Sequence, residues 1–236
     1  MRKKLAVVIP VYNEEESIKK VVNDWKKILP TKLFDLIIIN DGSTDNTKSI
    51  LSNFKKKIKN LIVINKKNAG HGKAVCDGYK FAIKKKYKYI FQTDGDNQFF
   101  ASDFKKLWSK KSNSNYDIIL GNRFKRNDPL IRIFLSKIVL RLLLKTLFGK
   151  YVIDPNIPYR LIKTDFMSEF IKLNPTKFIA PNIIMTLLAK KLIFVRVKHS
   201  VRSYGEVSWP LKKLLKFGIT LLKDLKKFHS LSQKFN

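Results

Sequence analysis

The sequence predicts an α/β protein in which helices cover both faces of a mostly parallel, Rossmann-like sheet. Over residues 1–120, short apolar runs alternate with longer polar segments that have helical spacing. Strands that alternate with helices form βαβ units, whose strands run parallel. In addition, a chain of 236 residues with an apolar fraction of 44% is long enough to bury one substantial core.

In the first half of the chain, the apolar runs are predicted strands and the segments between them are predicted helices. The expected strands are Leu5–Val11, Leu33–Ile39, Leu61–Ile64, Tyr87–Phe91 and Asp117–Leu120. The expected helices are Glu14–Leu29, Asp45–Lys57, Gly72–Lys86 and Ser102–Lys111. Thr44 or Asp45, and Ser102, are candidate N-caps, since short polar side chains accept hydrogen bonds from the first free N–H groups of a helix.

The second half is expected to begin with a strongly apolar helix, Ile131–Phe148, followed by a loop rich in Pro and Asn. The elements expected next are strands Tyr159–Ile162 and Ile193–Lys198 and helices near Lys163–Lys172 and Asn182–Lys190. The last element, Leu211–Phe228, is amphipathic at 100° per residue. Its cations are Lys212, Lys216, Lys223 and Lys227, and its apolar side consists of Leu214, Phe217, Leu221, Leu225 and Phe228.

The most informative stretch is Asp94-Gly95-Asp96-Asn97-Gln98, which follows a predicted strand. Strand alternation is expected to place positions 94, 96 and 98 on one side. Two carboxylates and an amide oxygen suit Mg²⁺ or Mn²⁺, bound jointly with substrate phosphates. Ligands bind at the carboxyl ends of strands in α/β sheets. An acidic turn is the alternative, because Asp-Gly is a common turn dipeptide.

Three other predicted strand ends have a similar composition. The first strand ends at Pro10 and exposes Tyr12 and Glu14, which are suited to stacking on a base and accepting from its N–H groups. The second strand is followed by Asn40–Thr47, an amide and a carboxylate with small polar residues. Asn68–Lys73 contains a Gly-x-Gly turn and a lysine at a helix N-terminus, where phosphate could bind. For the first loop, the alternative is a Pro turn into a helix whose first-turn acids complement the helix dipole, and for the second it is a capped helix start.

These segments, in this order, resemble the family 2 glycosyltransferases of the GT-A fold. The matching segments are Val8–Glu15, Ile39–Thr47, Asn68–Lys73, Gln92–Gln98 and Gly121–Phe124. Within the family, the chain looks most similar to the dolichyl/polyprenyl-phosphate sugar transferase branch. That branch has a Gly-Ser-Arg-Tyr-like segment, amphipathic helices, an Asp…Phe-Arg loop and a final Arg followed by Gly and Ser. The matching residues here are Gly121–Phe124, Ile131–Phe148, Asp154 with Tyr159-Arg160, and Arg202 with Gly205 and Ser208.

The resemblance covers residues 5–210 and implies a role for individual positions. The nucleotide sugar would be bound by Pro10, Tyr12, Glu14, Asn40, Asp41, Lys73, Asp94, Gly95, Asp96 and Arg202. The divalent metal, Mg²⁺ or Mn²⁺, would be held by Asp94, Asp96 and Gln98. The acceptor would be bound by Arg123, Arg160 and Ser208. Metal and arginine together would neutralise the charge that develops on the leaving diphosphate.

The acceptor is less clearly indicated than the donor. Many family members that act on hydroxyl groups have a catalytic carboxylate near the segment that is Phe178–Asn182 here, and this segment contains no acid. A phosphate acceptor is already anionic and needs no general base, so this composition favours a lipid phosphate. If a base exists, Asp154 is the best candidate. The alternative for Asp154 is a turn residue before Pro155.

The resemblance therefore implies an inverting, metal-dependent enzyme that moves a hexose from a UDP- or GDP-sugar to a polyprenyl phosphate. The same donor machinery with a saccharide hydroxyl acceptor, as in cell-surface polysaccharide synthesis, is the alternative. Residues 1–210 are the expected GT-A domain, with donor binding in 1–124 and acceptor binding in 125–210. Residues 211–236 are expected to form a separate amphipathic helix. The sequence does not distinguish uracil from guanine, or one sugar from another.

The net charge of +31, from 49 Lys and Arg against 18 Asp and Glu, favours a polyanionic partner. A general preference for lysine is the alternative explanation. A nucleic-acid-binding module is disfavoured, because the usual basic–aromatic signatures are absent and the strand-end loops are acidic. An anionic membrane surface fits better, because cations recur along both amphipathic helices.

These helices predict a peripheral protein on the cytoplasmic face of the cell membrane. Packing on the sheet, on a second copy of the chain or on a separate membrane protein is the alternative. No stretch reaches about 18 uncharged apolar residues, so no transmembrane helix is expected. The first residues are expected to form a strand and not a signal peptide. The single cysteine, Cys76, fits a reducing compartment.

Overall fold

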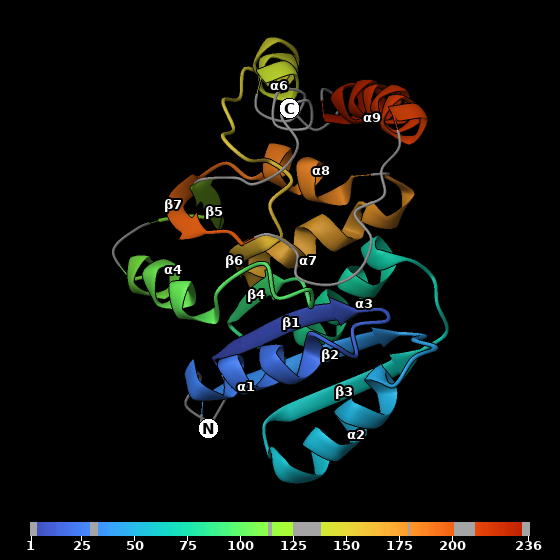
Figure 1. The fold of residues 1–236 in the computed structure, drawn as a ribbon. Coiled ribbons are helices and arrows are strands. Elements are labelled where there is room, and N and C mark those ends of the chain that lie inside the picture. Colours follow the sequence, from blue (N-terminus) through green and yellow to red (C-terminus); the bar gives the residue numbers. More distant parts are fainter. Residues whose placement is uncertain are drawn as a thin grey trace.

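The structure, a computed structural model of the chain, describes residues 4–28, 33–112, 115–124, 138–178, 180–200 and 211–232. Its centre is a seven-stranded sheet in the order β3-β2-β1-β4-β6-β5-β7 (Figure 1). The strands are β1 (Leu5–Val11), β2 (Phe34–Asp41), β3 (Leu61–Lys66), β4 (Tyr89–Thr93), β5 (Ile118–Phe124), β6 (Tyr159–Lys163) and β7 (Leu192–Lys198).

The sheet is mostly parallel, as the sequence predicts. β1 runs parallel to both β2 and β4, β2 runs parallel to β3, and β5 runs parallel to β7. β6 is antiparallel to its neighbours β4 and β5, so it joins two parallel parts of the sheet. Because β1 lies between β2 and β4, the chain first adds β2 and β3 on one side of β1 and then returns to add β4 on its other side. Such a switch point leaves a crevice at the carboxyl ends of the strands.

Helices cover both faces of the sheet. The helices are α1 (Ile18–Ile28), α2 (Thr47–Lys57), α3 (His71–Lys84), α4 (Phe104–Lys110), α6 (Leu140–Phe148), α7 (Thr164–Lys172), α8 (Pro181–Leu188) and α9 (Leu211–Ser232). The short 3₁₀ segments are η1 (Ala101–Asp103) and η3 (Pro175–Lys177). On one face, Trp25 of α1 packs against Phe91 of β4 at 5.4 Å and against Phe104 of α4 at 5.6 Å between ring centroids. α3 packs on the other face, over β1, β2 and β4, with α7 beside it.

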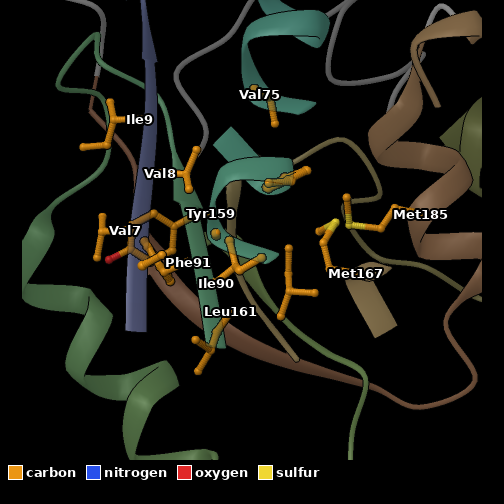
Figure 2. Packing of buried hydrophobic residues seen from close by; sticks show 14 of the residues in the cluster. Val7, Val8, Ile9, Val75, Ile90, Phe91, Tyr159, Leu161, Met167 and Met185 are labelled. Atoms are coloured by element: carbon orange, nitrogen blue, oxygen red, sulfur yellow. The ribbon is translucent and has the colours of Figure 1, made fainter. Parts of the chain in front are cut away.

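Burial on both faces explains why β1 and most of β2 consist of apolar residues. Every residue of β1 and of β2 is buried, because each strand has helices on both sides. Figure 2 shows Val8 pointing toward α3, whereas Val7 and Ile9 point to the other side of β1.

α3 approaches β1 closely at Gly78. A Cβ atom on this glycine would lie 2.3 Å from Cγ1 of Val8 and 3.3 Å from Cγ1 of Ile39. Only glycine fits at this point, so the helix can lie against the strands and bring its N-terminus to the carboxyl edge of the sheet.

Several predicted boundaries need correction. β2 continues to Asp41 and β5 continues to Phe124, so the Gly121–Phe124 segment lies on a strand. α1 begins at Ile18, later than expected. The predicted N-cap at Ser102 is wrong, because Ser102 lies inside η1 and Asp103 occupies the cap position of α4.

The last helix packs on the protein. In α9, the predicted apolar residues Leu221, Leu225 and Phe228 are 7%, 0% and 5% exposed. The Phe228 ring lies 6.0 Å from that of Phe148 in α6 and 6.3 Å from that of Phe178. The expectation that Leu221, Leu225 and Phe228 lie in a membrane is therefore corrected, since the protein itself covers them, whereas Ile219 and Leu222 of the same helix are 57% and 42% exposed.

α6 and α9 lie at the same end of the molecule (Figure 1). The predicted helix Ile131–Phe148 lies partly outside the described residues, and its described part includes α6. Ile138, Val139 and Leu142 are 56%, 44% and 61% exposed. Within the described part of the chain, no helix combines the length and apolarity needed to cross a bilayer. The expected domain boundary at residue 210 stays a prediction.

Candidate active site

A cavity of about 500 Å³ opens at the carboxyl ends of β1, β2 and β4, at the switch point of the sheet. It brings together the loops that follow four strands. Its lining residues are Pro10, Val11, Tyr12, Glu14, Asp41, Asn68, Gly70, His71, Asp94, Gly95 and Asp96. Seven of the predicted donor residues share this cavity: Pro10, Tyr12, Glu14, Asp41, Asp94, Gly95 and Asp96.

The loops after β1 and β2 are tied to each other. The backbone N–H of Asn13 donates to Oγ of Ser43 at 3.0 Å, and the N–H of Thr44 donates to Oδ1 of Asn13 at 2.8 Å. Asn13 has a φ of +53°, a left-handed conformation that asparagine adopts more readily than most residues. These contacts make the two loops a single wall, with Tyr12 at its edge and 47% exposed.

Glu14 is held in place by Ser17. Oγ of Ser17 lies 2.7 Å from Oε2 of Glu14 and 2.8 Å from the carbonyl oxygen of Gly95. Ser17 thus connects the loop after β1 with the acidic loop after β4. The sequence did not indicate this role, since the two loops are 78 residues apart.

Asn40 and Asp41 shape the cavity through contacts with the protein. Both carboxylate oxygens of the buried Asp41 accept backbone hydrogen bonds, from Ala69 at 3.0 Å and from Gly70 at 2.8 Å, and Lys66 pairs with Oδ1 at 2.7 Å. Oδ1 of Asn40 accepts from Oγ of Ser43 at 2.6 Å, and Nδ2 of Asn40 donates to Oδ1 of Asn65 at 2.9 Å. An amide suits position 40, because it supplies both an acceptor and a donor.

The acidic loop after β4 is a turn. Oδ1 of Asp96 accepts from the backbone N–H of Gln98 at 3.1 Å, and Asn97 has a φ of +58°. The expected strand alternation of positions 94, 96 and 98 is therefore wrong, since β4 ends at Thr93. A Cβ on Gly95 would lie 2.6 Å from Cγ1 of Val11, so glycine lets this turn pack against the end of β1.

His71, at the start of α3, contacts the acidic loop. Its Nε2 lies 3.0 Å from Oδ1 of Asp94, and its side chain is 55% exposed. Desolvation alone would lower the pKa of His71, but the Asp94 carboxylate, helped by Asp96, outweighs this and raises the pKa above its usual value. His71 is a site residue that the sequence indicated only weakly, by its place in a Gly-x-Gly turn.

The donor groups of the acidic loop fit a divalent metal that is shared with substrate. Asp94 and Asp96 supply carboxylates and Gln98 supplies an amide oxygen, all hard ligands. Within the described residues, no group of three or more His, Cys, Asp and Glu side chains could hold a metal. A metal at this loop would therefore need oxygens from a bound ligand, as Mg²⁺ does when it uses one or two carboxylates and substrate phosphates.

Lys73 lies in a neighbouring cavity of about 410 Å³. This second cavity shares Gly70 and His71 with the first. Its lining residues are Ala69, Gly70, His71, Gly72, Lys73, Thr176, Phe178 and Pro181. Lys73 is thus beside the first cavity, between the starts of α3 and α8.

Two of the predicted acceptor residues, Arg123 and Arg160, are not among the residues that line either cavity. Nε and Nη2 of Arg123 donate to the two oxygens of Asp154 at 2.7 and 2.8 Å, and the side chains are 10% and 4% exposed. Because both oxygens of Asp154 accept from this guanidinium, the geometry favours a positioning role for Asp154 over that of a base. Arg202 and Ser208 lie outside the described residues.

Arg160 is fully buried, so the expected contact with an acceptor is corrected. Its side chain is 0% exposed, and no described residue bonds to its Nε. Burial lowers the pKa of Arg160, while Tyr79, Asp94 and Asp154 oppose that shift. The charge of Arg160 is therefore buried inside the protein, near enough to Asp94 of the site to interact with its carboxylate.

The comparisons with known proteins agree with this arrangement. Residues 6–170 match the family model described as Glycosyl transferase family 2. An uncharacterized protein of Methanocaldococcus jannaschii, MJ0544, is 33% identical over 173 residues, covering 70% of this chain and 74% of that protein. Undecaprenyl-phosphate 4-deoxy-4-formamido-L-arabinose transferase of Photorhabdus laumondii is 27% identical over 224 residues, covering 93% of this chain and 67% of that protein.

Solved structures share the fold at low identity. Glucosyl-3-phosphoglycerate synthase of Mycobacterium tuberculosis, in complex with Mn²⁺, UDP and glucosyl-3-phosphoglycerate, has a TM-score of 0.70 at 15% identity, covering 97% of this chain and 80% of that one. S. aureus TarS in complex with UDP-GlcNAc has a TM-score of 0.60 at 20% identity, covering 88% and 62%. Because the family model matches residues 6–170, which is most of the chain, this chain belongs to glycosyl transferase family 2 and is a glycosyltransferase with the GT-A fold.

Proposed function

We propose that the protein is an inverting transferase that moves a hexose from a UDP- or GDP-sugar to a polyprenyl phosphate, with Mg²⁺ or Mn²⁺ as cofactor. One observation carries this proposal: the cavity between β1 and β4 has Tyr12 and Glu14 on one loop and Asp94 and Asp96 on another. An aromatic ring and a carboxylate suit a nucleoside, and a pair of acids suits a metal-bound diphosphate.

The donor site follows from these loops. Tyr12 is available to stack on the base, and Glu14, oriented by Ser17, can accept from a base or ribose donor. The mycobacterial synthase with the same fold was crystallised with Mn²⁺ and UDP, which supports a nucleotide and a metal at this edge of the sheet. Asp94, Asp96 and Gln98 would hold the metal, which would neutralise charge on the departing diphosphate.

His71 would assist at the same place. Its Nε2 lies 3.0 Å from Oδ1 of Asp94, and the ring is part of the cavity lining. An N–H of the ring can donate to a diphosphate oxygen or hold Asp94 in place. Such a donor would also stabilise the negative charge that develops on the leaving group.

The acceptor part of the proposal depends on what the chain lacks and on one relative. Residues 178–182 contain no Asp or Glu, and both oxygens of Asp154 are engaged by Arg123. An acceptor that is already anionic needs no general base. The relative from Photorhabdus is named as a transferase acting on undecaprenyl phosphate, which supports this acceptor class.

A lipid acceptor would require contact with a membrane, and we place the protein peripherally on the cytoplasmic face. The exposed residues Ile138, Val139 and Leu142 near and on α6 support this placement. The strongly basic composition would add attraction to acidic lipids.

The test is a transfer assay that crosses UDP- and GDP-sugars with two acceptors, a short-chain polyprenyl phosphate and a saccharide. Mn²⁺, Mg²⁺ and EDTA are compared in each reaction. We expect metal-dependent sugar transfer to the lipid phosphate only. Transfer to the saccharide alone would reverse the acceptor assignment. Undiminished transfer in EDTA would show that the reaction needs no divalent metal.

Asp96→Ala tests the metal site in the same assay. Loss of a direct ligand should lower the rate by about a thousandfold or more, with the circular dichroism spectrum unchanged. A variant that keeps metal-dependent turnover within about tenfold of the parent contradicts the assignment.

A further inference from the structure

We infer that the backbone carbonyl of Ser200 fixes the side-chain amide of Gln98 so that its oxygen, and not its NH₂ group, is presented to the metal. The inference rests on the proposed function, because it concerns the metal named there. It assigns Ser200 as a positioning residue and explains why this ligand is an amide.

Gln98 and Ser200 are joined by a reciprocal set of contacts. Nε2 of Gln98 donates to the carbonyl oxygen of Ser200 at 3.3 Å. The backbone N–H of Ser200 donates to the carbonyl oxygen of Gln98 at 3.0 Å. Oγ of Ser200 lies 3.2 Å from that same carbonyl oxygen and 3.4 Å from the carbonyl oxygen of Asn97. The acidic loop is thus held by a residue 102 positions further along the chain.

The residues next to this contact strengthen it. Phe99 and His199 form an antiparallel backbone bridge, and their rings pack at 5.1 Å between centroids. The N–H of Lys198 donates to Oδ2 of Asp103 at 2.6 Å. Three consecutive residues, the last of β7 and the two after it, are therefore attached to the acidic loop or to the chain that follows it, so Ser200 has little freedom to shift.

The chemistry of the two groups sets the orientation. A backbone carbonyl only accepts, so the NH₂ end of the Gln98 amide must face Ser200. Oε1 then points away from Ser200, and no described residue donates to it in the structure. A carboxylate at this position would bring an oxygen against the Ser200 carbonyl. An amide is therefore the side chain that serves both the carbonyl and a metal ion.

The backbone of the loop also depends on this support. Asn97 has a φ of +58°, a sparsely populated conformation that persists when the surroundings hold it in place. Oγ of Ser200 reaches the carbonyl of this residue. Outer contacts that orient a ligand typically change metal affinity by about 10–100-fold when they are lost.

Gln98→Glu distinguishes this role from that of a simple ligand. Added charge should tighten Mn²⁺ binding if Gln98 is only a ligand, whereas we expect binding about 10–100-fold weaker because the Ser200 carbonyl repels the new carboxylate. Asn97→Asp is the matched control, since it adds the same charge one residue earlier and keeps the Gln98 amide. Mn²⁺ binding is measured by the EPR signal of unbound Mn²⁺, with the metal alone and with UDP or GDP.

Unfolding of the metal-free protein gives a second reading. Gln98→Glu should lower the melting temperature by about 2–4 °C, and Asn97→Asp should not. If Gln98→Glu does not fold, Ser200→Ala replaces it: loss of the Oγ contacts should weaken Mn²⁺ binding several-fold, and Ser200→Thr should restore it. Gln98→Glu binding Mn²⁺ as tightly as the parent or more tightly overturns the inference alone. A parent chain that binds no Mn²⁺ under any of these conditions overturns the proposed metal and the inference together.

Discussion

At the scale of residues, many polar side chains around the cavity bond to the protein itself. Both oxygens of Asp41 hold the loop before α3, and Oδ1 of Asp45 accepts from the N–H of Thr47 at the start of α2. Burial alone would raise the pKa of Asp45, but hydrogen bonds from Thr47 and Glu15 lower it. A polar residue at a strand end is therefore as often a part of the scaffold as a ligand.

Asp154 provides a test of this distinction. Asp154→Ala removes both hydrogen bonds that Asp154 accepts from the buried Arg123 guanidinium, so we expect the free energy of unfolding to fall by about 3–5 kcal/mol. Glu169→Ala is the control, because the Glu169–Lys172 pair is 64% and 70% exposed. That change should cost about 1 kcal/mol or less. Urea denaturation measures both, and equal losses would contradict a structural role for the Asp154 pair.

Cys76 gives a prediction about pH. Burial raises the pKa of its thiol to about 11, whereas an unfolded cysteine titrates near about 8.5. The folded protein should therefore react with iodoacetamide at pH 8 roughly two-hundredfold more slowly than the denatured protein. Because the unfolded thiol loses its proton first, this group should reduce stability as pH rises from about 8.5 to 11. Equal alkylation rates in the two states would show that the thiol is exposed.

At the scale of elements, close approach decides where α3 begins and hence where His71 lies. Gly78 lets α3 lie on β1, and the helix then directs its N-terminus toward the loop after β4. The period of the sequence predicts that this segment is a helix. It does not predict how near the helix comes to the strand, since that depends on the space between Gly78 of α3 and the Val8 side chain of β1.

Two glycine substitutions test this packing. Gly78→Ala should reduce the free energy of unfolding by about 1–3 kcal/mol, because the added methyl group meets Cγ1 of Val8 in a filled core. Gly218→Ala in α9 has no neighbour within 4 Å and should raise stability by about 0.5–1 kcal/mol, since alanine favours helix. Thermal and urea unfolding measure both changes, and a loss of stability in both variants would contradict the explanation.

At the scale of the whole molecule, exposed apolar residues and exposed cations occur together at the end formed by α6 and α9. The net charge is +31, and α6 and α9 lie together at one end of the molecule, far from α2 (Figure 1). The cations Lys145, Lys216, Lys223 and Lys227 on these helices are exposed. Because Leu221, Leu225 and Phe228 of α9 pack on the protein, insertion into lipid would depend on the exposed apolar residues near and on α6 and on the exposed Ile219 and Leu222 of α9.

Vesicle flotation tests the orientation on a membrane. The protein should float with vesicles that contain acidic lipid at low salt and dissociate partly at high salt. Lys145→Glu on α6 should weaken this binding more than Lys56→Glu on α2, although the two variants have the same net charge. Equal weakening would mean that binding follows total charge only, and no flotation of the parent would remove the membrane from the proposal.

Much of the fold could be predicted from the sequence, because strand and helix periods are local. The mainly apolar runs of the first two predicted strands and the polar residues that follow them predict a parallel sheet with ligand loops at one edge. The family resemblance added the roles of those loops. β6 was predicted as a strand, but its reversed direction was not, since direction depends on the connections between elements.

The sequence by itself determined the order of elements, the apolar core strands and the acidic residues that line the cavity, because these follow from periods of two and 3.6 residues and from what directly follows a strand. Only the tertiary structure decided which polar groups bond to one another. The pairs Arg123–Asp154, His71–Asp94 and Gln98–Ser200 are separated by 31, 23 and 102 positions. Contacts over such distances arise from the way the strands are ordered in the sheet, and no local pattern in the chain records them.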